Sequence, residues 1–534
     1  MRYKIHFTKE KRTYEAEEGM TLLQAAIAAE IFPDAPCGGL GKCGKCKMWV
    51  DEIEILACQT EVHQEMWVDT GIDEKKNAQI LQTGLGRGVA CAPGELPHEV
   101  LRPLLAAVDL GSTSVVAYLI DGKTGEMLSI KSMLNPQRQY GADVVMRGNY
   151  AMEHGAQTLS GCIRDGIDEL LHKSAEDIGR NAEDIVRITM VGNSCMHHLF
   201  LEIPVDTLVV APYEPKVKDG VVRSALECGL HVYPEAKLFW LPNVGGFVGA
   251  DTAACILAAE YDKREELTLM IDIGTNGEMV LGDKNGFSAC STAAGPAFEG
   301  AKITCGMRGS AGAIDHVSLR DGEIWYHMIG DDEWKKADGE PEYIAAEESQ
   351  KKTELTEKVN EQSEAEHSIE YEKLDKPTGI CGSGLLDAVH CLLLTDQIDD
   401  TGRMEETFYF SSDVFLNQRD IRELQLAKAA IAAGVQMLCK RRRVKVTEIK
   451  KVLLAGAFGN YMNPESACGI GLIPKELLDC IIPVGNLAGK GAQIAALNED
   501  EYQKSKDLAK EADFVELALD PDFQDVYVDE MFFL

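Results

Sequence analysis

The chain has 534 residues, which is enough for several domains with sizeable buried cores. Its 87 acidic residues outnumber its 53 basic ones, and the formal net charge of −34 argues against nucleic acid or an anionic membrane as its main partner. The sequence has no apolar run of about eighteen residues and no apolar segment at its start, so we expect neither a membrane helix nor a secretory signal. The 16 cysteines are therefore expected to be reduced in a cytoplasm, and any clustered set of them to bind metal.

Residues 1–73 are predicted to form a small mixed module. Ile5 and Phe7 alternate with polar residues, as in a half-buried strand, and Thr21 is placed to cap a helix over 22–29. A cysteine- and glycine-rich loop follows, and then two strand-like segments, KMWV and ILACQTEV.

Residues 74–104 mix Gly, Pro and charged residues without a period and are predicted to be a linker, whereas 105–534 have an α/β texture. Within that second part, segment 106–125 is echoed by segment 269–286. Each runs from an apolar strand through Asp, Gly and a small polar pair into another apolar strand. The repeat predicts two related halves of one bilobed unit, each opening with a β-hairpin.

Two features stand out in the later half of the chain. Residues 335–376 hold 13 acids against 7 bases and few large apolar side chains, so we expect a solvated surface insertion, helical in part or disordered. Beyond it, residues 420–440 carry an apolar stripe at helical spacing, and Asn417 can cap that helix.

A metal site is predicted in the loop PCGGLGKCGKCKMW. Cys37, Cys43 and Cys46 are spaced by five and then two residues, and Cys58 follows in ILACQT. The glycines let the backbone wrap closely and aim N–H groups at cluster sulfurs. A structural zinc site of four cysteines is the alternative, but zinc ligands usually come as two C-x2-C pairs, and this loop has one. The spacing therefore favours an iron–sulfur cluster.

The triplet spacing and the LACQ phrase resemble those of plant-type and adrenodoxin-type [2Fe–2S] ferredoxins. The resemblance implies a β-grasp-like module that holds one [2Fe–2S] cluster. The sequence departs from those ferredoxins in that Cys58 follows Cys46 much more closely than their fourth ligand does. Cys91, in the predicted linker, is the other candidate. We favour Cys58 because it ends an apolar strand, as the fourth ligand should.

A nucleotide site is predicted at the two repeated turns. Asp109 and Asp272 each precede a tight turn in which Gly permits close approach of the backbone to phosphate oxygens. Each Asp can hold Mg²⁺ directly or through water. A third segment, VLLAGAFGNYMNPES (452–466), runs from an apolar strand into a Gly-rich turn suited to packing against a nucleoside. Each signal alone is common, but the three in this order are specific.

Together the three segments resemble the acetate kinase, sugar kinase, Hsp70 and actin superfamily, whose members close two ribonuclease-H-like lobes over ATP. The resemblance implies that the two turns grip phosphates and Mg²⁺ and that the third segment borders the adenosine. Glu278 stands where some relatives keep a water-activating carboxylate, and it could equally be an exposed strand residue. The candidate catalytic residues are thus Asp109, Asp272 and Glu278, and the candidate cofactor-binding residues are Gly111, Ser112, Thr113, Gly274, Thr275, Asn276, Gly456, Phe458 and Gly459.

Further segments, in order, resemble the reductive activators of corrinoid proteins over nearly the whole chain. They are NPQRQYGADVVMR, VGNSCMHHLF, GGFVGADT, AAGPAFEGAKITCGM, GICGSGLLDA and DIRELQLAKAAI. The resemblance implies an α+β multidomain fold, in which a small ferredoxin domain precedes a bilobed ATPase. It also implies that the protein uses ATP to pass one electron from its [2Fe–2S] cluster to a Co(II) corrinoid, regenerating Co(I) for methyl transfer.

The implied cofactors are the [2Fe–2S] cluster, ATP and Mg²⁺. The implied partners are the corrinoid protein of a methyltransferase system and an external low-potential electron donor, with no nucleic acid and no membrane. Whether the protein forms a homodimer is left open. The sequence leaves open which corrinoid protein is served.

Three other proteins fit parts of the pattern. A small-molecule kinase with a regulatory iron–sulfur module would transfer phosphate to an added acceptor. An ATP-driven activator of another low-potential enzyme, such as a dehydratase, would serve a different partner. A non-enzymatic electron carrier or sensor would bind ATP without turnover. A corrinoid activator would instead release phosphate, stimulated by its corrinoid partner.

Overall fold

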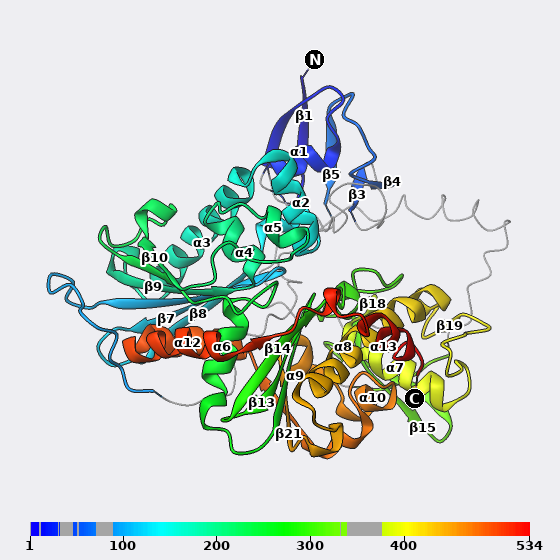
Figure 1. Cartoon of the computed structure of the whole chain (residues 1–534). Coiled ribbons are helices and arrows are strands. Elements are labelled where there is room, and N and C mark those ends of the chain that lie inside the picture. Colours follow the sequence, from blue (N-terminus) through cyan, green and yellow to red (C-terminus); the bar gives the residue numbers. More distant parts are fainter. Residues whose placement is uncertain are drawn as a thin grey trace.

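The computed structural model describes residues 2–9, 12–29, 31, 46–50, 53–70, 89–331, 333–338 and 376–533. Figure 1 shows a small N-terminal module at the top of the view and two larger lobes below it. Within the described ranges, no helix is both long enough and apolar enough to cross a membrane.

The N-terminal module is a five-stranded sheet with one helix, in the strand order β2-β1-β5-β3-β4. Its elements are β1 (Arg2–Phe7), β2 (Arg12–Glu17), α1 (Leu22–Ala28), β3 (Lys47–Val50), β4 (Ile53–Leu56) and β5 (Met66–Asp69). As expected, Ile5 and Phe7 are buried, whereas His6 between them is half-buried and Lys4 before them is exposed. The buried residues of this module form a core of their own, drawn entirely from residues 5–68.

Local sequence determines where the helix of the module begins. The Thr21 hydroxyl accepts a hydrogen bond from the Gln24 N–H (3.2 Å), and the Gln24 side chain accepts one from the Thr21 N–H (3.0 Å). This reciprocal capping confirms the predicted cap. The predicted strand over ILACQTEV is shorter than expected, because β4 ends at Leu56 and a turn follows.

The described part of the predicted linker, residues 89–104, is not a free tether, and its last residue, Leu104, begins β6. The Ala92 N–H donates to the carbonyl of Leu497 (2.7 Å), and a guanidinium N–H of Arg187 donates to the carbonyl of Pro93 (2.6 Å). Leu96 and Val100 pack against a small buried apolar cluster of the first lobe. This stretch is therefore anchored on the first lobe, and the rest of the predicted linker, 74–88, lies outside the described residues.

The first lobe is built on a six-stranded sheet in the order β10-β11-β9-β6-β7-β8. Its strands are β6 (Leu104–Leu110), β7 (Ser114–Asp121), β8 (Met127–Leu134), β9 (Ile185–Gly192), β10 (Val221–Ser224) and β11 (Lys237–Trp240). Its helices include α2 (Val144–His154), α3 (Gln157–Asp177), α4 (Ser194–Phe200) and α5 (Asp206–Val209).

The second lobe has a six-stranded sheet in the order β22-β21-β12-β13-β14-β23 and a smaller sheet in the order β17-β16-β15-β18. The strands of the larger sheet are β12 (Thr268–Ile273), β13 (Gly277–Asp283), β14 (Gly286–Thr292), β21 (Lys451–Ala455), β22 (Ile481–Gly485) and β23 (Asp513–Phe514). Those of the smaller sheet are β15 (Ala313–Arg320), β16 (Glu323–Met328), β17 (Lys335–Lys336) and β18 (Gly379–Ile380). The helices include α7 (Gly382–Leu394), α8 (Gln418–Arg442), α9 (Gly456–Tyr461), α10 (Pro464–Gly469) and α13 (Phe523–Asp529).

The two large sheets have equivalent centres, which confirms the predicted repeat. β6 pairs antiparallel with β7 and parallel with β9, and β12 pairs antiparallel with β13 and parallel with β21. Each lobe thus opens with the expected β-hairpin, and Asp109 and Asp272 are the penultimate residues of the first strands of the two hairpins. The two sheets build the bilobed α/β architecture that the resemblance implied.

Two helices, α6 (Ala250–Ala258) and α11 (Leu487–Leu497), join one hydrophobic core with residues of both large sheets. They approach so closely that a Cβ added at Gly491 would lie 2.1 Å from the carbonyl oxygen of Ala254. Alternate residues of β12 enter different cores, Met270 facing this one and Ile271 the core on the far side. The strand is apolar throughout because both of its faces are covered.

The predicted long helix is confirmed as α8, and Asn417 caps it together with Asp420 in a capping box. For the predicted acidic insertion 335–376, the structure describes only 335–338 and 376, with Lys335 and Lys336 forming β17. The expectation of a solvated excursion concerns mainly residues 339–375, which lie outside the described residues.

Candidate functional site

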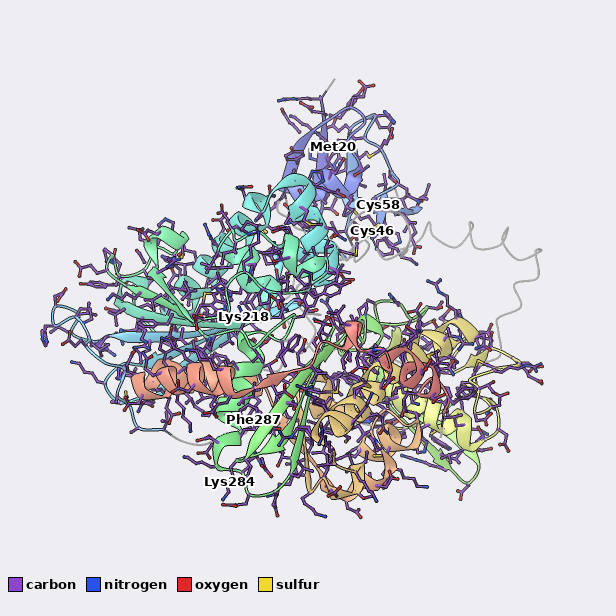
Figure 2. The ribbon with its side chains drawn as sticks, in the orientation of Figure 1. Met20, Cys46, Cys58, Lys218, Lys284 and Phe287 are labelled. Carbon is purple, nitrogen blue, oxygen red and sulfur yellow. The ribbon has the colours of Figure 1, made fainter. Side chains whose placement is uncertain are left out.

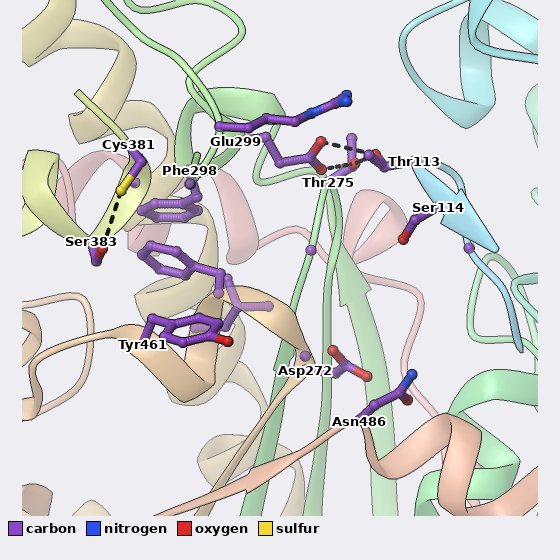
Figure 3. Close-up of a pocket in the computed structure, with 18 of the residues that line it drawn as sticks. Thr113, Ser114, Asp272, Thr275, Phe298, Glu299, Cys381, Ser383, Tyr461 and Asn486 are labelled. Carbon is purple, nitrogen blue, oxygen red and sulfur yellow. Dashed lines mark hydrogen bonds between the residues drawn. The ribbon is translucent and has the colours of Figure 1, made fainter. Parts of the chain in front are cut away.

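A cavity of about 520 Å³ lies where the two hairpin turns face each other (Figure 3). Eleven of the twelve predicted catalytic and cofactor-binding residues line it: Asp109, Gly111, Ser112, Thr113, Asp272, Gly274, Thr275, Asn276, Glu278, Gly456 and Phe458. The twelfth, Gly459, is buried in α9 and does not line the cavity. Residues distant in the sequence are thus brought to one site.

The two turns are closed in the same way. The Gly111 N–H donates to the Ser114 carbonyl (3.0 Å), and the Gly274 N–H donates to the Asn276 carbonyl (2.9 Å). A Cβ at Gly111 would lie 2.8 Å from the Ser114 carbonyl oxygen, so the first turn has no room for a side chain. At Gly274 the nearest atom would be 3.7 Å away, an ordinary contact.

The third predicted segment enters the site as a helix instead of a Gly-rich turn. β21 ends at Ala455 and α9 begins at once with Gly456, whose φ of +84° lets the chain change direction there. A Cβ at Gly456 would lie 2.5 Å from a carboxylate oxygen of Asp272. The glycine therefore allows the start of α9 to approach the second hairpin.

An aromatic stack forms one wall of the cavity. The rings of Phe298 and Phe458 lie 4.7 Å apart with an angle of 21° between their planes, and Tyr461 lies beside them in Figure 3. Gly382 packs so tightly here that a Cβ would lie 2.0 Å from the carbonyl oxygen of Phe298 and 2.8 Å from the Phe458 ring. This wall offers flat apolar surface of the kind that stacks on a nucleobase.

Four of the carboxylates that line the cavity belong to Asp109, Asp251, Asp272 and Glu278. Desolvation raises the pKa of Asp109 to about 6, against the hydrogen bond that Asn486 donates to it (2.8 Å). Desolvation and then the charge of Asp109 raise the pKa of Asp272 to about 7. The pKa values of Asp251 and Glu278 are also raised, first by desolvation and then by neighbouring carboxylates. Such mutual repulsion is relieved when a divalent cation binds between the carboxylates.

Side chains of three other elements hold the first turn in place. The Asn135 amide donates to the Gly111 carbonyl (2.8 Å), and the Asn193 amide donates to the Ser112 hydroxyl (3.0 Å). The fully buried Arg147 donates to the carbonyls of Ser112 (2.6 Å) and Gly141 (2.9 Å). These contacts fix the backbone of Ser112 at the edge of the cavity.

Sequence reasoning missed several residues that line the cavity. They are Asn193, Asp251, Phe298, Glu299 and Asn486, and a group on β15 and β16 that includes Asp315, His316 and His327. Asp251 stands in GGFVGADT and Glu299 in AAGPAFEGAKITCGM, segments whose likeness to a family was noticed without a role for these residues. His316 lies 3.1 Å from the buried carboxylate of Asp387, a pairing to which no local spacing points.

The second candidate site is the cysteine hairpin of the N-terminal module. Cys46 directly precedes β3, Cys58 follows β4 by two positions, and the two strands pair antiparallel with Lys47 opposite Leu56. The Ala57 N–H donates to the Cys46 carbonyl (2.8 Å), so Cys46 and Cys58 lie at the same end of the hairpin (Figure 2). Cys37 and Cys43 lie outside the described residues.

Cys91 is placed elsewhere. Its thiol donates to the carbonyl of Gly122 (3.5 Å) in the first lobe, and desolvation together with the charge of Asp121 raises its pKa. Cys58 instead packs against the core of the N-terminal module. This geometry favours Cys58 over Cys91 as the partner of Cys46. Among the described residues alone, no group of three His, Cys, Asp or Glu side chains could hold a metal ion.

Comparisons with known families match almost the whole chain. Residues 5–71 match the family described as "2Fe-2S iron-sulfur cluster binding domain", residues 104–264 match "RACo middle region", and residues 266–534 match "C-terminal domain of RACo the ASKHA domain". The three matches follow the module and the two lobes in order.

Two relatives and one solved structure are similar over most of the chain. The "Corrinoid activation enzyme RamQ" of Eubacterium limosum is 34% identical over 454 residues, which cover 79% of this chain and 69% of the relative. The "[Co(II) methylated amine-specific corrinoid protein] reductase" of Methanosarcina barkeri is 26% identical, with 80% and 76% covered. A structure described as "Reductive activator for corrinoid,iron-sulfur protein" is 26% identical, with 99% and 98% covered and a TM-score of 0.67. The chain therefore belongs to the family of reductive activators of corrinoid proteins.

Proposed function

We propose that this protein uses ATP to drive one electron from a [2Fe–2S] cluster in its N-terminal module to the Co(II) of a corrinoid protein, restoring Co(I) for methyl transfer. One observation carries the proposal. The same chain holds a cysteine hairpin in a ferredoxin-like module and a carboxylate-lined cavity between two Asp-Gly hairpins. Its family and the names of its relatives agree with that combination.

The residues present fit an iron–sulfur cluster. The β3–β4 hairpin brings Cys46 and Cys58 to one end of the module, and the loop that ends at Cys46 carries Cys37 and Cys43. These four thiolates would hold the cluster, with Cys58 as the fourth ligand. When bound, the cluster would supply one electron at about −400 mV, the potential typical of plant-type ferredoxins.

The cavity fits Mg-ATP. The turn amides and the hydroxyls of Thr113 and Thr275 would bind phosphate oxygens, and the Phe298–Phe458 stack would border the base. Asp109, Asp251 and Asp272 would bind Mg²⁺ through its water ligands, which relieves their mutual repulsion. Glu278 lies in the same carboxylate group and is our candidate for orienting the attacking water.

The nucleotide is needed because the reduction potential of the Co(II)/Co(I) couple is expected to be lower than that of the cluster. Each 100 mV of uphill transfer costs about 2.3 kcal/mol for one electron. Nucleotide binding between the two hairpins can favour one relative arrangement of the lobes, and a corrinoid protein that prefers this arrangement would bind in a form that is easier to reduce. An external low-potential electron donor would then reduce the oxidised cluster again.

The test combines the anaerobic protein, a chemical reductant, Mg-ATP and a Co(II) corrinoid protein, followed by visible spectroscopy. We expect Co(I) to appear only with ATP. Cys58→Ala should lose the cluster colour, while the matched variant Cys91→Ala should keep it. Asp272→Asn should keep the colour and stop ATP-dependent reduction, while Asp165→Asn, on the exposed side of α3, should behave as the wild type. Phosphate transfer to a small acceptor without Co(I) formation would contradict the proposal and favour a kinase.

A further inference from the structure

Glu299 joins the two hairpin turns by hydrogen bonds. Its carboxylate accepts one hydrogen bond from the Thr113 hydroxyl (2.9 Å) and another from the Thr275 hydroxyl, and the two hydroxyl oxygens lie 3.2 Å apart (Figure 3). Thr113 belongs to the first hairpin and therefore to the first lobe, whereas Thr275 and Glu299 belong to the second. The Thr113–Glu299 hydrogen bond thus spans the cleft between the lobes.

The position of Glu299 is fixed by its own backbone. It ends a 3-10 turn, Pro296–Glu299, which is closed by Gly300 with a φ of +73°. A Cβ at Gly300 would lie 2.6 Å from both the backbone nitrogen and the carbonyl oxygen of Met307, so only glycine fits there. Phe298, next to Glu299, is part of the aromatic wall of the cavity. The carboxylate is therefore held at the cavity by the same turn that positions this wall.

A threonine hydroxyl has one proton and can donate one hydrogen bond at a time. The two hydroxyls that bind Glu299 are those that the proposed function assigns to phosphate oxygens. A carboxylate and a phosphate oxyanion are both acceptors of such bonds, and their negative charges repel each other. Glu299 and the phosphate chain must therefore compete for the same donors.

We propose that Glu299 is an internal competitor of the nucleotide phosphates. Its carboxylate joins the two phosphate-binding turns by hydrogen bonds across the cleft and is displaced when ATP binds. Each binding event then exchanges one link between the lobes, through Glu299, for another through the phosphates. The nucleotide affinity is lowered by this competition, and in return nucleotide binding is coupled to the relative position of the lobes. The inference rests on the proposed nucleotide site and names a residue that regulates it.

The test measures dissociation constants of the full-length protein for Mg-ATP and for adenosine, by calorimetry. Glu299→Gln keeps the size of the side chain but removes its charge and one of its two acceptor oxygens. We expect it to bind Mg-ATP about tenfold more tightly than the wild type, because removing a charged hydrogen-bond acceptor changes binding by this order. Its affinity for adenosine, which carries no phosphate, should stay within about twofold.

Two further variants complete the comparison. Glu299→Asp keeps the charge but is shorter by one methylene, so it should tighten Mg-ATP binding less than Glu299→Gln does. Glu183→Gln removes an exposed carboxylate in a turn of the first lobe and should leave both affinities unchanged. If Glu299→Gln fails to fold, Glu299→Asp still tests the competition, because its shorter side chain reaches the hydroxyls of Thr113 and Thr275 less well while it retains the charge.

The failure of this inference differs from the failure of the proposed function. If the wild type binds Mg-ATP and Glu299→Gln binds it equally well or more weakly, Glu299 is no competitor. A fall in kcat for ATP hydrolysis at an unchanged dissociation constant would also overturn the inference, since it would make Glu299 a catalytic group instead. If the wild type does not bind Mg-ATP, the proposed nucleotide site is wrong, and the inference falls with it.

Discussion

The carboxylates of the cavity hold protons more tightly than exposed carboxylates do. The pKa of Asp272 is about 7 in the folded protein, well above the 3.8 of an exposed aspartate. A raised pKa favours the protonated native state, so this stabilising contribution is complete below about pH 4 and is lost as the pH rises to about 7. Above that pH the folded protein must keep these carboxylates ionised side by side unless a cation binds them.

Replacing Asp272 by Asn removes one of these charges. Without divalent cation we expect Asp272→Asn to match the wild type in stability below about pH 4 and to exceed it by about 1–2 kcal/mol at pH 8, less than the full shift because the carboxylate faces the water of the cavity. Mg-ATP should stabilise the wild type at pH 8 but not the variant. Thermal unfolding at several pH values measures this, with Asp165→Asn as the control, and a difference that does not change with pH would contradict it.

Arg147 is a second residue whose role can be measured. It is fully buried and binds the carbonyls of both Ser112 and Gly141. Arg147→Lys keeps the charge but cannot reproduce the planar fork that reaches both carbonyls. We expect a loss of about 2–3 kcal/mol in stability and about tenfold weaker Mg-ATP binding, because the first turn loosens. The exposed Arg223→Lys should have neither effect, and an unchanged ATP affinity in Arg147→Lys would show that Arg147 only supports packing.

At the scale of elements, the first turn of helix α8 binds the loop that follows Glu299. Asp420 is fully buried, and its carboxylate accepts hydrogen bonds from the N–H (2.7 Å) and hydroxyl (2.9 Å) of Thr304 and from the N–H of Asn417 (3.2 Å). One residue therefore caps the helix and also binds the neighbouring loop. The sequence indicated Asn417 as the cap, but the role of Asp420 and its contact with Thr304 depend on the fold.

Asp420→Ala should lower the stability of the protein by about 2–4 kcal/mol, since it leaves buried donors without an acceptor. Asn417→Ala, which removes the other half of the capping box and a hydrogen bond to the Thr304 hydroxyl (3.0 Å), should cost about 1–2 kcal/mol. The midpoints of urea unfolding give the comparison. Equal effects of the two variants would mean that the two hydrogen bonds from Thr304 to Asp420 contribute no more than the one from Asn417 to Thr304.

The elements that could be predicted are those whose signal is local. The two hairpins were recognisable because each strand, its Asp and its Gly turn are contiguous, and α8 because its apolar stripe and cap are. The sequence predicts a turn where the structure has helix α9, because a glycine directly after an apolar strand is typical of a turn. In the structure Gly456 has a positive φ and begins a helix. Asp251 and Asn486 reach the cavity from α6 and from the start of α11, and no spacing along the chain reports such tertiary contacts.

At the scale of the whole molecule, the N-terminal module has its own core, and residues 89–103 are anchored on the first lobe. The domain boundaries 1–73 and 105–534 remain a prediction. By its packing, the first lobe already includes residues 89–103. We expect residues 89–534 alone to bind Mg-ATP within about twofold of the full chain and to reduce no corrinoid. Calorimetry and visible spectroscopy measure the two properties, and a more than tenfold loss of ATP affinity would show that the module is part of the nucleotide site.

The path of the chain after β22 limits how the protein can be taken apart. α11 and α12 (Glu499–Glu511) return to the core of the first lobe, where Glu499 pairs with Arg187, before β23 and α13 rejoin the second. A polypeptide truncated near residue 264 would therefore lose the helices that cover α6. Neither lobe can be excised as one continuous piece, and recombinant dissection of the ATPase would require fragment complementation, with a separate 486–511 peptide supplied to the isolated first lobe.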